Sequence, residues 1–253
     1  MYQFKENTTV LVTGAATGIG HQTALAYADA GCDVVVADVD IERGQHTVKE
    51  VEKRGRHGLF VATDVSDPAQ VEALHEAIRK EFGTLDIACN NAGIEGEKAP
   101  TAEATLENFD RIININLRGL FLCMQQQIRM MEPHQSGSIV NIASVAGLVG
   151  FANLPAYCAS KGGVVQLTRA AALEYATCGI RINAVCPGAI KTEMIDRITG
   201  QDAETESQFA ALHAMNRMGT VQEVANSILW ISSPAAGFVT GHALAVDGGF
   251  VAR

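Results

Sequence analysis

Short apolar runs and stretches of helical periodicity alternate along the whole chain. Uniformly apolar strands that alternate with amphipathic helices are typical of a parallel sheet covered on both faces. The pattern therefore predicts one doubly wound α/β domain over residues 1–253, with a mainly parallel sheet of about seven strands and helices on both faces. The predicted strands are 8–13, 33–38, 58–63, 85–90, 138–144, 180–186 and 243–247, and the predicted helices are 19–30, 42–54, 68–82, a long one ending near 131, and one through 157 to about 177.

One segment, 189–218, breaks this rhythm after the sixth predicted strand. It mixes apolar and charged residues over a length that connections in compact domains rarely reach. In open α/β sheets, ligands bind beyond the carboxyl ends of the strands, where mobile segments exclude water from a reaction. We therefore expect a substrate lid here, although a simple surface excursion would have the same pattern.

Composition and charge argue against several classes of protein. The 253 residues are 47% hydrophobic and 19% charged, which suits a globular protein with an ample core. No stretch approaches the roughly 18 apolar residues of a membrane span, and the first residues do not resemble a signal peptide. A net charge of -9 without a Lys/Arg cluster disfavours nucleic-acid binding. The sequence therefore predicts a cytoplasmic protein with neither a membrane nor a nucleic-acid partner.

The six cysteines are scattered along the chain, with no CxxC pair and no Cys/His cluster at zinc-ligand spacing. We expect reduced and mostly buried thiols, and no metal site. Cys158 adjoins Tyr157; packing is its expected role, and an oxidisable thiol is the alternative.

The glycine-rich segment 13–20 follows the first predicted strand and opens the first helix. Glycines permit a tight turn and let the backbone approach a pyrophosphate, whose charge is met by free N–H groups at the helix start. No Lys-Ser/Thr pair follows, so a nucleoside triphosphate site of the Walker type is disfavoured. We expect a dinucleotide here, in contact with Gly14, Thr17, Gly18, Ile19 and Gly20.

Asp38 ends the second predicted strand, where an acidic residue can accept hydrogen bonds from an adenosine ribose. A 2′-phosphate about 4 Å from this carboxylate would be repelled by roughly 4 kcal/mol at an effective dielectric constant near 20. The sequence therefore favours NAD over NADP. Arg43 lies close enough along the chain to keep NADP open, and a turn carboxylate is the structural alternative for Asp38, although Asp40 is better placed for that role.

Tyr157 and Lys161 lie four residues apart in a predicted helix, so their side chains share one face. A nearby ammonium and a cationic ligand can together lower a tyrosine pKa from about 10 towards 7, which takes roughly 4 kcal/mol. Such a tyrosine can act as a general acid or base near neutral pH. Ser144, at the end of the fifth strand, would hydrogen-bond the same substrate oxygen. An ordinary surface pair of Tyr and Lys has the same spacing.

Together these segments resemble the short-chain dehydrogenases/reductases, in the branch of about this length, and the resemblance covers nearly the whole chain. Residues 13–20 match the family's TGxxxGxG loop, 90–93 match its NNAG segment, and 157–161 match its YxxxK motif, with Ser144 thirteen positions ahead. No motif position departs from the family pattern. The resemblance implies a single Rossmann domain that binds a nicotinamide dinucleotide.

The resemblance also implies roles that spacing does not reveal. Asn116 would hold a water that links the lysine to solvent as a proton relay, and Asn114 is the nearer alternative. Lys161 would contact the nicotinamide ribose. The remaining cofactor contacts would come from residues after the third, fourth and sixth strands and from the catalytic helix, namely Asp64, Val65, Asn91, Ala92, Gly93, Tyr157, Lys161, Pro187, Gly188, Ile190 and Thr192.

We therefore expect an NAD-dependent oxidoreductase that transfers a hydride between a secondary alcohol and the nicotinamide. Tyr157 would move the hydroxyl proton, assisted by Lys161, Ser144 and Asn116. One alternative is an NADPH-dependent 3-oxoacyl-acyl-carrier-protein reductase, which Asp38 argues against. Another is an inactive dinucleotide-binding or sensing protein, which the intact catalytic set argues against.

The substrate is expected to be a small alcohol or ketone, and its class stays open among sugars, steroids, cyclic alcohols and hydroxyacyl compounds. The resemblance further implies a homotetramer, with 237–250 in the subunit contacts. The expected substrate pocket is formed by Ser144, Ala146, Leu154 and Tyr157, together with residues 94–96, Phe151 and the 189–218 segment.

Overall fold

A seven-stranded parallel sheet forms the centre of the computed structural model, which describes residues 4–252. Its strand order is β3-β2-β1-β4-β5-β6-β7, and every neighbouring pair is parallel. The predicted doubly wound α/β fold is confirmed, while the outermost residues of the predicted 1–253 domain lie outside the described range. The strands are β1 (Thr9–Thr13), β2 (Asp33–Asp38), β3 (Gly58–Ala62), β4 (Ile87–Asn90), β5 (Gly137–Ile142), β6 (Ile180–Pro187) and β7 (Ala243–Val246).

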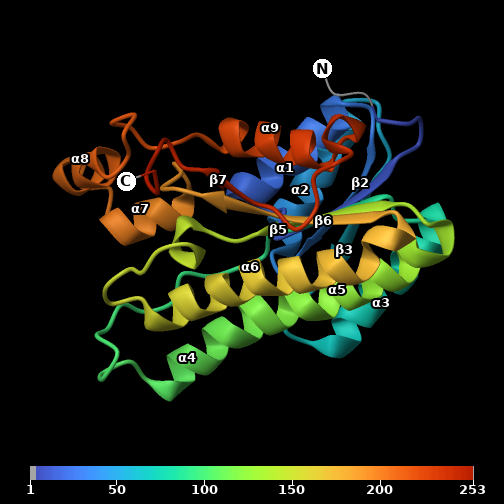
Figure 1. Ribbon diagram of the computed structural model, residues 1–253. Helices are drawn as coiled ribbons and strands as arrows, with labels where there is room; N and C mark the ends of the chain where they lie inside the picture. Colours follow the sequence, from blue (N-terminus) through green and yellow to red (C-terminus); the bar gives the residue numbers. More distant parts are fainter. Residues whose placement is uncertain (1–3, 253) are drawn as a thin grey trace.

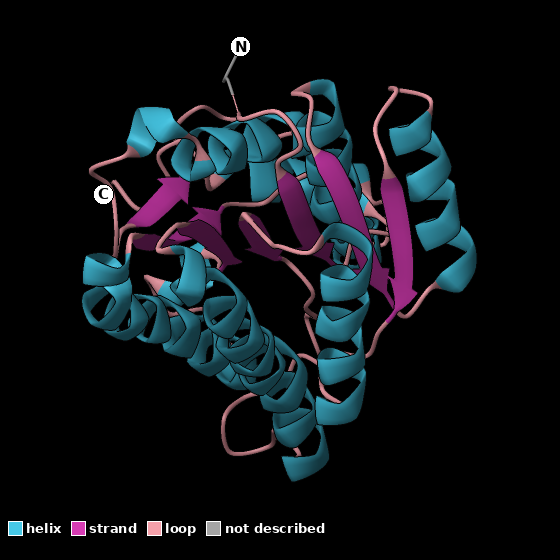
Figure 2. Ribbon diagram, turned by 90° about the vertical axis from the view of Figure 1, so that its right-hand side faces the viewer, coloured by secondary structure: helices cyan, strands magenta, loops and turns pink. Residues whose placement is uncertain are grey.

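Helices cover both faces of the sheet (Figures 1 and 2). One face carries α1 (Gly18–Asp29), α2 (Ile41–Glu52) and α9 (Val221–Ser232). The other carries α3 (Pro68–Phe82), α4 (Leu106–Ile113), α5 (Leu120–Met131) and α6 (Pro155–Tyr175). Alternate residues of β1 supply the two cores, since Val10 and Val12 pack on the first face and Leu11 packs on the second. This two-sided burial explains why the strands are apolar throughout.

The carboxyl ends of all seven strands meet at one edge of the sheet. The strand order reverses at β1, which lies between β2 and β4, so the connections after β1 and β4 leave in opposite directions. A crevice at such a point is the usual ligand site of an open α/β sheet. The segment 189–218 folds as α7 (Glu193–Thr199) and α8 (Ala203–Ala211) beyond this edge, close to the C-terminal residues (Figure 1).

The helix predicted to end near residue 131 contains a π-helical segment, η1 (Asn114–Gly119), between α4 and α5. Hydrophobic periodicity does not distinguish such an insertion from a regular α-helix, and π segments are frequent at functional sites. The sequence analysis also did not assign α9, which packs against α1. Single turns of 3₁₀-helix complete the secondary structure at η2 (Glu132–His134), η3 (Val145–Gly147), η4 (Ala176–Cys178) and η5 (Pro234–Ala236).

Between residues 4 and 252, no helix combines the length and the apolar character that a bilayer crossing requires.

A buried chain of amides ties the sheet to α5 and α6. Asn90 Nδ2 donates to Gln127 Oε1 and to Asn141 Oδ1, both at 2.9 Å, and Gln127 Nε2 donates back to Asn90 Oδ1 at 2.7 Å. Asn141 Nδ2 donates onward to Thr168 Oγ1 at 2.9 Å. Because these groups are buried, each depends on the others for its hydrogen bonds. The first asparagine of the NNAG segment therefore has a structural role.

We expect Asn90→Ala to lower the free energy of unfolding by about 1–3 kcal/mol, because it leaves the Gln127 amide and the Asn141 Oδ1 atom without the partner that they have in Asn90. Urea denaturation followed by circular dichroism measures this loss. Asn114→Ala is the control, since the Asn114 side chain is exposed. Equal stability of the two variants would contradict a structural role for the amide chain.

Candidate active site

The loop after β1 is shaped by close backbone contacts. Gly14 has a φ of +63°, and a Cβ at that position would lie 2.8 Å from Ala92 Cα. A Cβ on Gly20 would collide with the Gly14 carbonyl oxygen. The N-cap residue of α1, Thr17, makes no side-chain hydrogen bond to the first turn of its helix. The tight loop and the N–H groups of this first turn suit the pyrophosphate of a dinucleotide.

The segment after β4 braces this loop. Asn91 Nδ2 donates to the carbonyl oxygens of Thr13 and Gly14 at 3.0 and 2.9 Å. In return, Thr13 Oγ1 accepts the N–H groups of Asn91 and Ala92, each at 3.1 Å. These bonds join the connection after β1 to the connection after β4. The NNAG segment therefore supports the glycine-rich loop directly.

Asp38 is held against the same loop. Its Oδ2 accepts the Ala16 N–H at 2.9 Å, and its Oδ1 accepts the Asp40 N–H at 3.0 Å. Asp40 is the N-cap of α2 and accepts from Arg43 N, the capping role assigned to it from the sequence. Arg43, which kept NADP open, forms ion pairs with Asp40 at 2.6 Å and with Glu193 at 2.9 Å. The carboxylates of Asp40 and Glu193 thus both bind the Arg43 guanidinium.

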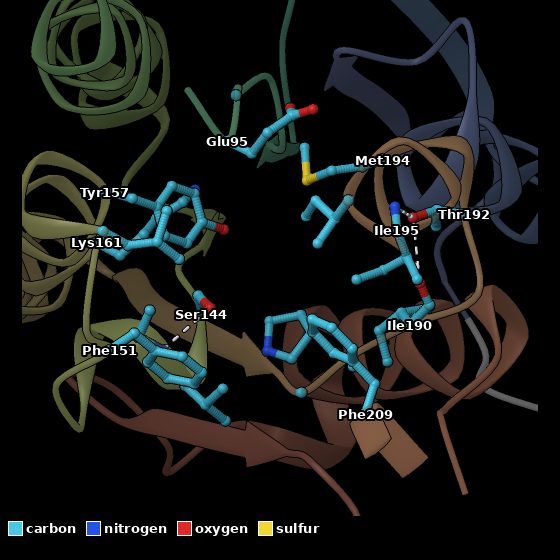
Figure 3. A pocket seen from close by; sticks show the side chains of 18 of the residues that line it. Glu95, Ser144, Phe151, Tyr157, Lys161, Ile190, Thr192, Met194, Ile195 and Phe209 are labelled. Carbon is cyan, nitrogen blue, oxygen red and sulfur yellow. Dashed lines mark hydrogen bonds between the residues drawn. The ribbon is translucent and has the colours of Figure 1, made fainter. Parts of the chain in front are cut away.

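Lys161 is 4% exposed, and its Nζ donates to the Ile142 carbonyl oxygen at 2.9 Å. The same Nζ lies 5.8 Å from the centre of the Tyr157 ring. Ser144 follows β5, and its Oγ accepts the Ala146 N–H at 3.1 Å, which fixes the start of η3. Tyr157 and Ser144 face the same cavity (Figure 3). The helical spacing of Tyr157 and Lys161 therefore places the ammonium behind the phenol.

Burial controls the protonation of both groups. It lowers the pKa of Lys161 to about 8, against a smaller raising effect of Cys186. It also raises the pKa of Tyr157, although the Ser144 hydroxyl lowers it in part. The sequence predicted that Lys161 and a cationic ligand would together lower the tyrosine pKa. Among the protein's own groups, desolvation of the phenolate is the largest cause of the shift in the Tyr157 pKa, and it outweighs the lowering by Ser144.

Asn116 is fully buried on η1, whereas the alternative, Asn114, is exposed. Asn116 Oδ1 accepts the Ile94 N–H, and Nδ2 donates to the Ile94 carbonyl oxygen, both at 2.8 Å. Nδ2 also lies 3.3 Å from Ser160 Oγ, which donates to the Tyr157 carbonyl oxygen at 2.8 Å. The amide therefore joins the connection after β4 to α6. The predicted water relay remains a prediction.

A cavity of about 400 Å³ opens at the carboxyl edge of the sheet. It brings together many of the predicted site residues, namely Ile19, Asn91, Gly93, Ser144, Ala146, Leu154, Tyr157, Lys161, Pro187, Gly188, Ile190 and Thr192. The other predicted cofactor residues, together with Asn116, do not line it; they are Gly14, Thr17, Gly18, Gly20, Asp38, Asp64, Val65 and Ala92. Of these, Asp64 bonds Ser66 and Val65 packs near Val71.

Several lining residues were absent from the predicted set. Phe250 stacks on Phe151 with ring centres 5.5 Å apart and meets His213 edge-on at 5.6 Å. The sequence analysis placed 237–250 in subunit contacts, so it missed this pocket role; no local pattern links Phe250 to a residue 99 positions earlier. Lys98 and Asn153 are further additions, whereas the lining residues Met194, Ile195, Ile198, Phe209 and Leu212 come from the 189–218 segment that was expected in the pocket.

His213 fastens the 189–218 segment to the end of β6. Its Nε2 accepts the Ala189 N–H at 3.0 Å, and its Nδ1 bonds the Phe209 carbonyl oxygen at 2.9 Å. This arrangement requires a neutral ring with the proton on Nδ1. The predicted lid segment is thus anchored directly beside Pro187 and Gly188.

Ion pairs lie near both ends of α7. Glu193 pairs with Arg43 on α2, and Arg197 Nε pairs with Glu95 Oε1 at 3.0 Å in the connection after β4. The helix therefore spans the cavity mouth from one flank to the other. Its apolar residues Met194 and Ile195 point into the cavity (Figure 3).

Within residues 4–252, no group of three or more His, Cys, Asp or Glu side chains is arranged to hold a metal ion. A phenol, a hydroxyl and an ammonium lie at the cavity beside the glycine-rich loop. These groups can transfer a proton to or from an oxygen in the cavity.

Comparisons with known proteins agree with this geometry. A family model described as enoyl-(acyl carrier protein) reductase matches residues 14–251. The chain is 43% identical to cis-4-hydroxycyclohexanecarboxylate dehydrogenase from Sinomonas cyclohexanicum, over 98% of both chains. It is 40% identical to cyclohexanol dehydrogenase from Acinetobacter sp. (strain SE19), over 98% of this chain and 96% of that protein. The crystal structure of levodione reductase superimposes with a TM-score of 0.95 at 36% identity, covering 98% of this chain and 100% of the other.

The lowered pKa of Lys161 predicts a pH dependence of stability. Between about pH 8 and the ordinary lysine pKa, the unfolded chain binds more protons at this group than the folded chain, so its contribution to stability increases with pH. Relative to Lys161→Met, the wild-type protein should gain about 2 kcal/mol between pH 7.5 and 9.5. Denaturant titrations at several pH values measure the difference. Lys80→Met, at an exposed position, should follow the wild type, and a parallel course for Lys161→Met would contradict the prediction.

Proposed function

Since this chain belongs to the short-chain dehydrogenase/reductase family, we propose that it is an NAD-dependent dehydrogenase that interconverts a secondary alcohol and a ketone. Membership makes the chain an oxidoreductase of a family that binds nicotinamide dinucleotides. The observation that carries the proposal is the convergence of Tyr157, Ser144 and Lys161 on one cavity beside the glycine-rich loop.

In the proposed mechanism, Tyr157 removes the proton of the alcohol oxygen during oxidation and returns it during reduction. Ser144 hydrogen-bonds the same oxygen and holds it near the phenol. The bound dinucleotide supplies the hydride acceptor and, in its oxidised form, a positive charge that favours the phenolate. Lys161 adds a second cation behind the ring and contacts the nicotinamide ribose. Asn116 holds the catalytic helix against the connection after β4 through its hydrogen bonds.

The preference for NAD is supported by the charges around the end of β2. The Asp38 carboxylate is fixed beside the dinucleotide loop, where it can accept hydrogen bonds from ribose hydroxyls. Arg43 is held by Asp40 and Glu193 and is therefore a poor partner for a 2′-phosphate. The proposed cofactor set otherwise follows the family motifs, including Asp64 and Val65 at the adenine.

The proposed substrate is a secondary alcohol on a six-membered carbon ring. The cavity is mainly apolar, and its wall contains the stacked pair of Phe151 and Phe250 together with Phe209. Flat aromatic and aliphatic surfaces of this kind suit a compact ring. The relatives named for hydroxycyclohexanecarboxylate and cyclohexanol support the same class. Segment 189–218 is the proposed lid that excludes water from this ring.

We further propose a cytoplasmic homotetramer. All six cysteines are free and four of them are buried, which suits a reducing compartment. The Phe238 side chain is fully exposed in the segment that resembles the family's subunit contacts, and a second copy of the chain would cover it.

Tyr157→Phe should reduce kcat for alcohol oxidation by at least about 10³-fold, because it removes the proton-transferring oxygen. Binding of NAD, measured by calorimetry, should change by less than about twofold, because the ring and its packing are retained. Tyr175→Phe, in the last turn of the same helix, should retain full activity. A Tyr157→Phe enzyme with near wild-type kcat would remove the phenol from the mechanism.

A spectrophotometric screen tests the reaction and the cofactor together. With NAD, cyclohexanol should give a kcat/KM at least about tenfold above that of 2-hexanol, which has the same carbon count but no ring. NAD should be preferred to NADP by more than about tenfold, equivalent to about 1.4 kcal/mol. The opposite cofactor preference would favour the acyl-carrier-protein reductase alternative. Dinucleotide binding without turnover on any alcohol or ketone would favour the inactive alternative.

A further inference from the structure

We propose that Glu193, the first residue of lid helix α7, is a specificity-determining residue for the dinucleotide. By pairing with Arg43, it prevents that guanidinium from receiving an adenosine 2′-phosphate. The inference rests on the proposed preference for NAD and adds a second determinant to Asp38, contributed by the lid.

The contacts of Arg43 carry this inference. Arg43 Nη1 donates to both carboxylate oxygens of Glu193, at 2.9 and 3.1 Å, and Arg43 Nε donates to Asp40 Oδ2 at 2.6 Å. The two carboxylates approach from different elements, since Asp40 caps α2 and Glu193 begins α7. The guanidinium is therefore turned from α2 towards the lid.

A continuous path connects this ion pair to the ribose end of the site. Asp38 Oδ1 accepts the Asp40 N–H, and Asp40 Oδ1 accepts the Arg43 N–H, each at 3.0 Å. On the other side, Thr192 precedes Glu193, and a Cβ on Gly18 would lie 3.5 Å from Thr192 Cγ2. Arg43 and Glu193 thus meet beside both the dinucleotide loop and Asp38.

The local charge balance explains the expected discrimination. Asp38, Asp40 and Glu193 provide three carboxylates around one guanidinium, so a 2′-phosphate would add further negative charge to an anionic corner. Arginine binds phosphate best with a free planar fork of N–H groups. Glu193 engages Nη1, one arm of that fork, and this is the proposed effect; direct repulsion of the phosphate by Glu193 would be a second effect. Engagement of the guanidinium requires Arg43, whereas direct repulsion of the phosphate does not, so removal of Arg43 distinguishes them.

The experiment measures the dissociation constants of NAD and NADP by calorimetry on the full-length protein. Glu193→Gln, which keeps the side-chain shape and removes the charge, should bind NADP about fivefold more tightly, with NAD changed by less than about twofold. The gain should disappear in the double variant with Arg43→Gln, because the released guanidinium is then absent. Both substituted side chains are half exposed or more, so the fold should be retained.

Arg197→Gln is the matched control on the same helix. It breaks the pair with Glu95 at the other end of α7 and leaves Arg43 engaged, so the NADP to NAD ratio should equal that of the wild type. An unchanged ratio in Glu193→Gln would overturn the inference. So would a gain that persists without Arg43, or an equal gain in Arg197→Gln, which would assign the effect to direct repulsion or to a loosened lid. A wild-type preference for NADP would instead refute the proposed cofactor.

Discussion

A buried ammonium sets the geometry of the catalytic half of this protein. Lys161 keeps its Nζ on the Ile142 carbonyl oxygen, and the cost of burying a charge requires the surrounding backbone to approach closely. Gly147 permits the close approach of α6, since a Cβ there would lie 2.6 Å from the Lys161 carbonyl oxygen, and Gly93 lies next to Nζ on the connection after β4. The catalytic helix is thereby fixed against β5, which places Tyr157 at the cavity.

The π-helical segment provides a second attachment for α6, close to Lys161. It carries the buried Asn116, whose amide bonds both backbone groups of Ile94 and reaches Ser160 on α6. One side chain thus aligns the connection after β4 with the helix that bears the phenol. Lys161 and Asn116 constrain the same region from two directions, which explains why the family motifs lie far apart in sequence and meet in space.

The sequence predicted the framework well, because buried strands and a glycine loop have local signatures. All seven strands and the Tyr157–Lys161 geometry could be read from residues close together in the chain. Contacts between remote segments have no such signature: Phe250 on Phe151, or Arg43 with Glu193, 150 positions apart. The direction of the Tyr157 pKa shift also depends on burial, which only the packed structure reveals.

The two ion pairs of α7 gain their importance from position rather than strength. Exposed pairs contribute about 0–1 kcal/mol each, so they cannot by themselves hold a lid closed. Met194 and Ile195 in the cavity and the hydrogen bonds of His213 must provide most of its attachment. Weak pairs at the rim would allow the proposed lid to open for exchange of ligands. The pair with Glu193 nevertheless holds Arg43 Nη1 in this structure, because this role depends on where the charge lies and not on a large interaction energy.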